Sequence, residues 1–473
     1  DKRGSIYGVY SISDMLGMTP WEFFCDSVPR HRDNLVVPEG YISIGEEPDV
    51  KYRGIFINDE ETLEAWARVM DDGKHLGPNL YEKIFEMLLR IKANYLWPGM
   101  HACSDAFSDY AENPVNADYY GIVIGTSHCD MLLRNNLNEW ESFVSEYAKS
   151  HGMKEDDIEY DYTVNPEIIR EYWRISVREN KDYEVQWTLG MRGAHDEPFT
   201  TANIDQAPWY GDKNMLMEQI IEDQRQILRE ELDNPTLEDV FMMFIPYKEV
   251  QTLYNDGLVV PEDVTIMWAD DNHGFIRNLP DEQERARSGG LGVYYHNSYW
   301  GPDNESYMWV NSMPFTMIYE EMSKAYAYDI DRAWILNAGD MIPNMPEIEF
   351  FVDLGCRISE YSPERVYETY FGKMASREFG EQFADEVTEI AKRYTLLTNA
   401  RKIEQMSVDI FSAAYGDESE KRAAAYKELY DLAESVYAAI PEQSRDCFYE
   451  TILSEVRNAY YTNAEVDYAH KSN

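Results

Sequence analysis

Cysteine is scarce in this chain of 473 residues, and its few cysteines show no pairing pattern. There are five of them, an odd number, and none has the close spacing that zinc fingers or redox motifs use. We therefore expect no disulfide framework, and interpret the cysteines as mostly free, buried thiols. Their scarcity leaves the compartment open, because a large secreted enzyme needs no disulfides.

Basic residues are outnumbered. Against 88 aspartates and glutamates stand 42 lysines and arginines, which gives a net charge of -46. Such a chain repels nucleic acid phosphates and anionic lipid headgroups alike. Long apolar runs are also missing, since none approaches the roughly 20 residues of a membrane-spanning helix. Neither a nucleic acid nor a membrane is expected as a partner.

Several enzyme motifs are missing as well. The sequence contains no HExxH, CxxC, GxGxxG or GxSxG, the patterns of zinc peptidases, thiol redox sites, dinucleotide-binding folds and serine hydrolases. We expect neither a cofactor nor a catalytic metal. With 44% hydrophobic residues, the chain can still bury one large core and a satellite domain.

Eight apolar runs alternate with helical patterns between residues 51 and 360. Each is apolar nearly throughout, as expected for a parallel strand covered on both faces. They cover residues 53–59, 92–98, 120–128, 182–193, 239–249, 263–272, 291–300 and 332–340. Right-handed crossovers would close eight such units into an α/β fold of the TIM barrel type, (β/α)8.

The flanking regions differ in character. Beyond about residue 361 only amphipathic helical patterns occur, so residues 361–473 are expected to form an all-α helical domain. The first residues, DKRGSIYGVY, lack a signal-peptide pattern and are interpreted as a strand followed by a short helix. We interpret residues 1–50 as a remnant and linker from a preceding α/β domain, and residues 51–360 as the catalytic barrel.

Polar side chains gather where the runs end, and active sites of TIM barrels lie at these carboxyl ends. The stretch WADDNHG, at residues 268–274, is one example. The candidate site residues are Glu60, Asp109, His128, Arg192, Asp196, Glu249, Asp270, Asn272, His296 and Tyr299. Carboxylates interleaved with aromatic rings suit general acid and base catalysis on a sugar, which glycoside hydrolysis requires.

The alternation of side chains along a strand gives WADDNHG a direction. Asp270 is expected to face the barrel axis and line the pocket. Asp271 should then face away and cap the turn, while Asn272 bends back towards the sugar or the backbone.

Six segments carry a family resemblance: KYRGIFINDE, NYLWPGMH, YGIVIGTSH, LGMRGAHDEP, YKEVQTLYNDGLVVPEDVTIMWADDNHGFIRNLP and GVYYHNSYWG. In these segments and their order the chain resembles glycoside hydrolase family 115, the α-glucuronidases of xylan. The resemblance implies inverting hydrolysis of the α-1,2 bond between glucuronic acid, or its 4-O-methyl form, and xylose. The implied substrates are glucuronoxylan or aldouronic acid oligosaccharides. The residues that it marks as functional are Glu60, Asp109, Arg192, Asp196, Glu249, Asp270 and Tyr299.

Roles are assigned by physical argument. Inversion needs two carboxyl groups roughly 6.5 to 9.5 Å apart, a separation that Asp196 and Glu249 on neighbouring strands could reach. Glu249, beside the apolar run FMMFIPY, is expected to have a raised pKa and act as the acid, while Asp196 near Arg192 acts as the base. Asp270 is a second candidate base or a hydroxyl ligand.

The uronate of the substrate needs a cation, and Arg192 offers a forked donor. The alternative is that Arg192 forms a salt bridge that orients Asp196, with Lys248 and His128 in reserve for the substrate. Asp105 could also replace Asp109, because the loop CSDAFSDY is less acidic than the family pattern.

Two other interpretations stay open. The chain could be a non-catalytic glycan-binding barrel, or a metal-dependent hydrolase that uses His101, His128, His195 and His296, although no two of these share a helix face at ligand spacing. We expect a secreted or periplasmic bacterial protein, and the sequence leaves a homodimer open.

Overall fold

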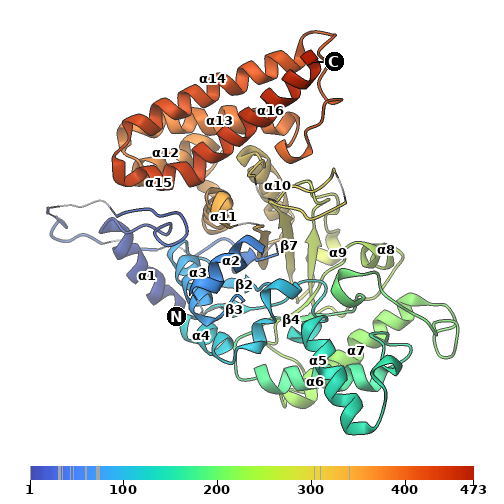
Figure 1. The fold of residues 1–473 in the computed structure, drawn as a ribbon. Helices are drawn as coiled ribbons and strands as arrows, with labels where there is room; N and C mark the ends of the chain where they lie inside the picture. The colour runs from blue at the N-terminus through green and yellow to red at the C-terminus, as the bar shows by residue number, and fades with distance from the viewer. Residues whose placement is uncertain are drawn as a thin grey trace.

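The computed structural model describes residues 2–29, 33–34, 36–42, 44–45, 47–58, 61–70, 75–302, 304–308, 310–339 and 341–472, with the backbone alone at 61 and 62. Within these residues, the fold is a barrel of parallel strands surrounded by helices, followed by a group of helices (Figure 1).

Eight parallel strands build the barrel, and all eight predicted strands are confirmed, each shorter than its apolar run. They are β1 (Tyr52–Phe56), β2 (Tyr95–Trp97), β3 (Val123–Ile124), β4 (Trp187–Leu189), β5 (Met242–Phe244), β6 (Thr265–Ala269), β7 (Leu291–His296) and β8 (Ala333–Asn337). Every strand residue is buried. Coverage on both faces explains the continuous apolar character of the runs.

The sheet order is β3-β2-β1-β8-β7-β6-β5-β4. Its two edge strands meet at a single parallel bridge between Ile124 and Val185, where Gln186 N donates to Ile124 O over 2.8 Å. Elsewhere the ladders are longer: β1 pairs with β8 over five residues, from Tyr52 opposite Ala333 to Phe56 opposite Asn337. The (β/α)8 prediction is therefore confirmed, with one short seam between β3 and β4.

Aromatic side chains fill the barrel interior. Tyr95, Trp97 and Tyr294 are buried there, and their polar groups have partners. Tyr95 Oη donates to Gln186 Oε1 over 2.7 Å, and Trp97 Nε1 donates to Tyr95 Oη over 2.7 Å. The interior is thus a packed core below the carboxyl ends of the strands, and Trp97 belongs to this core.

An outer layer of helices covers the strands. It contains α2 (Glu61–Met70), α3 (Pro78–Arg90), α4 (Glu112–Tyr120), α5 (Asn138–His151), α6 (Pro166–Asn180), α7 (Lys213–Glu231), α8 (Glu249–Asn255), α9 (Glu282–Arg285), α10 (Phe315–Ala327) and α11 (Met341–Cys356). On α3, for example, Leu80, Ile84 and Leu88 are buried. Their spacing of four residues places all three on the face turned to the sheet.

The chain before β1 differs from its prediction. Residues expected to form a strand and a short helix form one helix, α1 (Lys2–Met15). Ile6, Tyr7 and Tyr10 pack against the core, and Tyr7 Oη donates to Ala93 O over 3.0 Å. The helical spacing of these three side chains outweighs the strand propensity of the individual residues.

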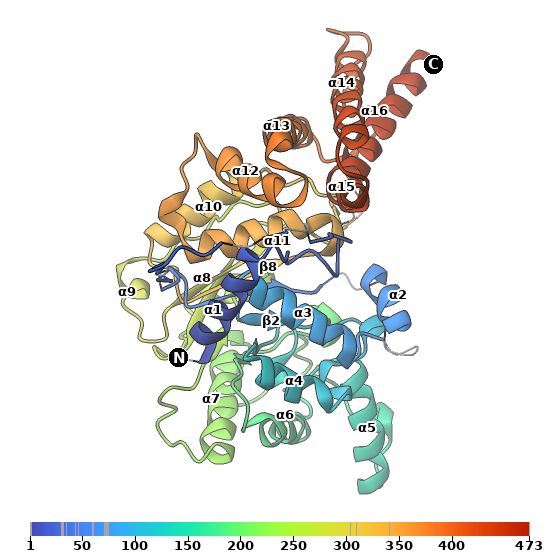
Figure 2. The ribbon, with the colours of Figure 1, turned by 90° about the vertical axis from the view of Figure 1, so that its left-hand side faces the viewer.

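The last part of the described chain is helical, as predicted. It comprises α12 (Val366–Glu378), α13 (Ala384–Ala400), α14 (Glu418–Ala439), α15 (Arg445–Phe448) and α16 (Ser454–Ser472), with a π-helical turn at Tyr449–Leu453. Figure 2 shows α14 and α16 running side by side away from the barrel. One apolar core continues from the barrel into these helices. The limits 1–50, 51–360 and 361–473 stay a prediction.

Cysteines and membrane segments can be checked directly. All five cysteines are free; Cys25, Cys129 and Cys447 are buried, and Cys103 and Cys356 are half-buried. The thiol prediction is confirmed. In the described part of the chain, no helix has both the length and the apolar composition that a membrane span requires.

The buried Gln186 offers a test of the barrel seam. Its Oε1 accepts from Tyr95 and its Nε2 donates to Thr188 Oγ1 over 2.9 Å. Gln186→Leu should lower the free energy of unfolding by about 1–3 kcal/mol, because buried donors and acceptors lose their partners. Gln226→Leu, on the exposed face of α7, is the matched control and should change it by less than about 0.5 kcal/mol. Equal urea midpoints for the two variants would contradict this account.

Candidate active site

A cavity of about 260 Å³ opens at the carboxyl ends of the strands. Segments that follow or end six of the strands line it: Asn58 after β1, Met100 and His101 after β2, His128 after β3, His195 and Asp196 after β4, Tyr247 and Lys248 after β5, and Tyr294, His296, Tyr299, Trp300 and Gly301 on or after β7. The site lies where the barrel geometry predicts it.

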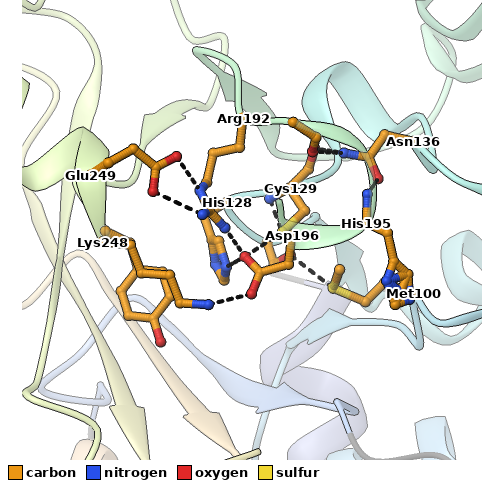
Figure 3. Close-up of polar contacts among 12 residues, drawn as sticks. Met100, His128, Cys129, Asn136, Arg192, His195, Asp196, Lys248 and Glu249 are labelled. Atoms are coloured by element: carbon orange, nitrogen blue, oxygen red, sulfur yellow. Dashed lines mark hydrogen bonds and ion pairs between the residues drawn. The ribbon is translucent and has the colours of Figure 1, made fainter. Parts of the chain in front are cut away.

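Asp196 has the most polar partners in this cavity (Figure 3). Its Oδ1 lies 3.0 Å from His128 Nε2 and 3.3 Å from Cys129 Sγ. Arg192 forms an ion pair with the same oxygen, and Lys248 forms one with Oδ2. Two cations and an imidazole therefore stabilise negative charge on Asp196.

The turn that carries Asp196 has an uncommon backbone. His195 and Asp196 both have positive φ, 49° and 61°, which costs energy in non-glycine residues. Asn136 holds the turn: its Nδ2 donates to Gly193 O over 2.9 Å, and its Oδ1 accepts from His195 N over 2.9 Å. Gly193 is also required, because a Cβ there would lie 2.5 Å from Pro198 O. Such local geometry fixes the direction of the Asp196 carboxylate.

Arg192 is buried behind Asp196, with 2% of its side chain exposed. Its Nε and Nη2 donate to Glu249 Oε1 and Oε2 over 3.0 and 2.9 Å. The forked donor is thus occupied by Glu249, and the remaining nitrogen by Asp196. Of the two roles predicted for Arg192, the structure supports the one that orients Asp196 over direct binding of the uronate.

Glu249 differs from its prediction. Burial acts to raise its pKa, but the hydrogen bonds and charge of Arg192, with the Phe199 N–H, outweigh burial and lower it. The expected raised pKa is therefore wrong. The neighbouring residues in the sequence are apolar, but the group that faces the carboxylate comes from the adjacent strand.

Two histidines on the cavity wall have carboxylate partners. Burial, with the charges of Arg192 and Lys248, lowers the pKa of His128 well below its usual value, so its imidazole is neutral at neutral pH. His296 Nδ1 lies 2.5 Å from Asp270 Oδ1. Asp270 is fully buried and accepts a further hydrogen bond from Gly274 N over 2.7 Å.

The first acid of WADDNHG differs from its prediction. The Asp270 carboxylate contacts His296 and Gly274 N and does not line the cavity. Asp271 is near the surface and caps the turn, accepting from His273 N and Phe275 N over 3.1 Å each. On β6, Met267 and Ala269 belong to the barrel interior and Trp268 to the outer core, so the predicted register of this strand is off by one residue.

Asn272 contributes to the site through a neighbouring residue. Its Oδ1 accepts from Tyr247 Oη over 2.8 Å, and its backbone carbonyl accepts from Tyr307 Oη over 2.7 Å. Asn272 thus positions Tyr247, which lines the cavity, and does not line it itself. Tyr299 does line the cavity, as predicted.

The loop after β2 is less involved than expected. Asp109 accepts from Ala106 N over 3.0 Å, and Asp105 accepts from Tyr110 Oη over 2.8 Å. Neither carboxylate lines the cavity. The residue types suggested acids after β2, but the path of the loop directs them elsewhere. Glu60 lies outside the described residues.

The sequence interpretation underrates two lining residues. It treats Tyr247 as part of an apolar run and Lys248 as a reserve, although both belong to the YKEV segment at the end of β5. Burial and the charge of Arg192 lower the pKa of Lys248. His101 and His195 face each other, with 3.4 Å between Nδ1 and Nε2.

The four-histidine metal site is not assembled. His128 contacts Asp196, and His296 contacts Asp270. His101 and His195 instead contact each other. One group of possible ligands, His128, Cys129 and Asp196, has donor atoms within 4.8 Å of one another. Arg192 and Lys248 already contact both oxygens of Asp196, and this positive charge opposes a metal cation.

Comparison with known proteins identifies the family. The sequence model described as glycosyl hydrolase family 115 matches residues 45–405. The solved structure of BtGH115A, described as a family GH115 4-O-methyl-α-glucuronidase with specificity for decorated arabinogalactans, has a TM-score of 0.87 and 34% identity. The match covers 98% of this chain and 61% of that chain.

A more distant structure shares the fold alone. A GH138 enzyme, described as targeting pectin rhamnogalacturonan II, has a TM-score of 0.53 and 10% identity over 92% of this chain and 60% of its own. No curated protein matches the sequence. The match over residues 45–405 and the 34% identity to BtGH115A show that this chain belongs to glycosyl hydrolase family 115.

Proposed function

We propose that the chain is a glycoside hydrolase that removes α-1,2-linked glucuronic acid, or its 4-O-methyl form, from glucuronoxylan or its oligosaccharides, with inversion. The family and the printed activity of BtGH115A support an α-glucuronidase. The observation that carries the proposal is Asp196, a carboxylate on the cavity wall paired with two cations. The specificity of BtGH115A makes a decorated arabinogalactan the second candidate polymer.

Asp196 fits the role of the catalytic base. It removes a proton from a water molecule as the water oxygen bonds to the anomeric carbon and the glycosidic bond breaks; the leaving oxygen takes a proton from an acid. The imidazole of His128 and the ammonium of Lys248 hold the carboxylate in place. Glu249 acts through Arg192 in this scheme and is a positioning residue.

Lys248 is the best partner for the substrate's uronate. Its ammonium lies on the cavity wall, whereas the Arg192 guanidinium is buried behind it. An ammonium that pairs with Asp196 Oδ2 can also face a second carboxylate in the cavity. His128, His296 and Tyr299 are proposed to bind the sugar hydroxyls.

The first prediction concerns Asp196. Asp196→Asn should lower kcat on aldouronic acids by a factor on the order of 100 to 10000, because the base is lost. Binding of glucuronic acid, measured by calorimetry, should persist, because no attraction to the uronate is removed. Near-normal turnover in this variant would exclude Asp196 as the base. Absence of turnover in the unaltered chain, with sugar binding retained, would favour the non-catalytic glycan-binding barrel.

Glu249→Gln is the matched carboxylate-to-amide control. If Glu249 only positions Arg192, its substitution should lower kcat for aldouronic acids and kcat for p-nitrophenyl glucuronides by similar factors. A proton donor would instead be needed only for the poor leaving group. Loss confined to the natural linkage would therefore restore Glu249 as the acid. Proton NMR of the first product formed from the unaltered enzyme should show the β-anomer.

Lys248→Met tests recognition of the uronate. The dissociation constant for glucuronic acid should rise about tenfold or more, because a charge-assisted hydrogen bond is lost. The constant for glucose should change by less than about twofold, since glucose carries no carboxylate. Calorimetric titration of both sugars gives the comparison, and equal losses for both would contradict the role of Lys248.

The Asp270–His296 pair gives a further test. Asp270→Asn should lower kcat by a factor on the order of 100, because an amide keeps only one acceptor oxygen. Either the His296 imidazole or Gly274 N then loses its acceptor, and the orientation of the ring is no longer fixed. Asp271→Ala, the adjacent control, should lose about 1 kcal/mol of stability and keep its turnover. An active Asp270 variant beside an inactive, stable Asp271 variant would contradict the assignment.

A further inference from the structure

The cavity lining combines charged groups with aromatic rings. Asp196 and Lys248 supply the charged groups. His101 and Trp300 also line the cavity, and their ring centroids lie 5.2 Å apart. Burial, together with the adjacent His195, lowers the pKa of His101 to about 4, so its ring carries no charge at neutral pH. His101 and Trp300 therefore present flat, uncharged rings to the cavity.

Trp300 combines exposure with a place on the cavity wall. Half of its surface, 50%, is accessible although it lines the cavity. An indole face left in water is a surface that gains free energy when an apolar face of a ligand covers it. The adjacent Gly301 leaves room for Tyr299, since a Cβ at 301 would lie 2.2 Å from the Tyr299 ring.

The segment that carries Trp300 is held by backbone pairing. Tyr299 and Tyr307 form an antiparallel bridge with N–H···O distances of 2.8 and 3.0 Å. Ser306 Oγ accepts from Gly301 N over 3.0 Å. Tyr307 is itself buried, and its hydroxyl donates to Asn272 O. The position of Trp300 therefore depends on the strand opposite it.

That opposite strand is anchored from the helical region, in the link between α13 and α14. Glu404 accepts from Met308 N and Val310 N over 2.9 and 2.8 Å, one with each carboxylate oxygen. Lys402 Nζ lies 3.7 Å from the centre of the Tyr307 ring and donates to Ser312 Oγ over 3.2 Å. The amino group of Lys402 thus holds the Tyr307 ring, while the Glu404 carboxylate holds the backbone that follows it.

We propose that Trp300 and His101 form a subsite for the neutral sugars of the leaving chain, and that Glu404 positions this subsite from the helical region. The proposal rests on the proposed function for its substrate, a β-linked chain of neutral sugars that bears the uronic acid. The ring of Trp300 covers the C–H face of one sugar, and the neutral imidazole of His101 hydrogen-bonds a hydroxyl. Charged recognition stays with Lys248.

Calorimetry with sugars that lack uronic acid tests the subsite without turnover. The probes are xylotriose and β-1,6-galactotriose, which separate a xylan chain from an arabinogalactan chain. Trp300→Ala should weaken binding of whichever probe the protein binds by about tenfold, because an aromatic contact is lost. Binding of glucuronic acid should change by less than about twofold, and Trp300→Phe should restore most of the affinity.

Glu404→Gln tests the positioning role. An amide has one acceptor oxygen, so one of the two backbone N–H groups loses its partner. The dissociation constant of the neutral probe should rise about threefold or more, and KM for the oligosaccharide substrate should rise more than kcat falls. Glu442→Gln, an exposed glutamate elsewhere in the helical region, should leave both constants unchanged.

The outcomes separate the two proposals. Failure of both neutral probes to bind, or equal weakening of neutral and charged sugars by Trp300→Ala, would overturn the subsite. Unchanged probe binding in Glu404→Gln would overturn the positioning role. If the subsite binds a neutral probe and the enzyme releases no uronic acid, the proposed function fails while the subsite stands.

Discussion

The site depends on one buried guanidinium. Arg192 contacts two carboxylates at once, one from the turn after β4 and one from the first residue of α8 after β5. A buried charge is tolerated only when it is paired. Loss of either acid would therefore leave the buried Arg192 guanidinium without one of its two carboxylate partners. This three-way contact fixes the relation between two neighbouring strand ends and thereby the direction of Asp196.

The chain as a whole is strongly negative, whereas its cavity contains a positively charged group. The net charge is -46, yet among the described residues that line the cavity Lys248 supplies an ammonium. A uronic acid approaching such a surface meets repulsion until it reaches this group. Local placement of one cation therefore matters more for recognition than overall composition does.

The sequence could predict what depends on local pattern. Apolar runs identified eight strands, and the rule that barrel sites lie at carboxyl ends led to Asp196, His128, His296 and Tyr299. It could not predict what depends on partners from other elements. The sequence around Glu249 is apolar and does not reveal that Arg192 faces it. Nothing near Asp270 in the sequence indicates that His296 contacts its carboxylate.

The loops set a further limit. Asp109 lies on a segment whose path is not encoded in any periodicity, and its carboxylate serves that segment itself. The role of Glu404 is equally invisible in the sequence, because nearly a hundred residues separate it from the amides whose hydrogen bonds it accepts. Long-range pairs of this kind emerge only after the whole chain has folded.

The single bridge between Ile124 and Val185 has a consequence for the order of assembly. Every other pair of neighbouring strands is joined by a ladder of at least two residues. The contact between β3 and β4 is therefore the weakest in the barrel. A sheet of this kind can form as an open, curved ribbon and close last at its weakest contact. The contact between β3 and β4 is then the first to open in the native state. Amide hydrogens near residues 124 and 186 would exchange with solvent before those of β7 and β8.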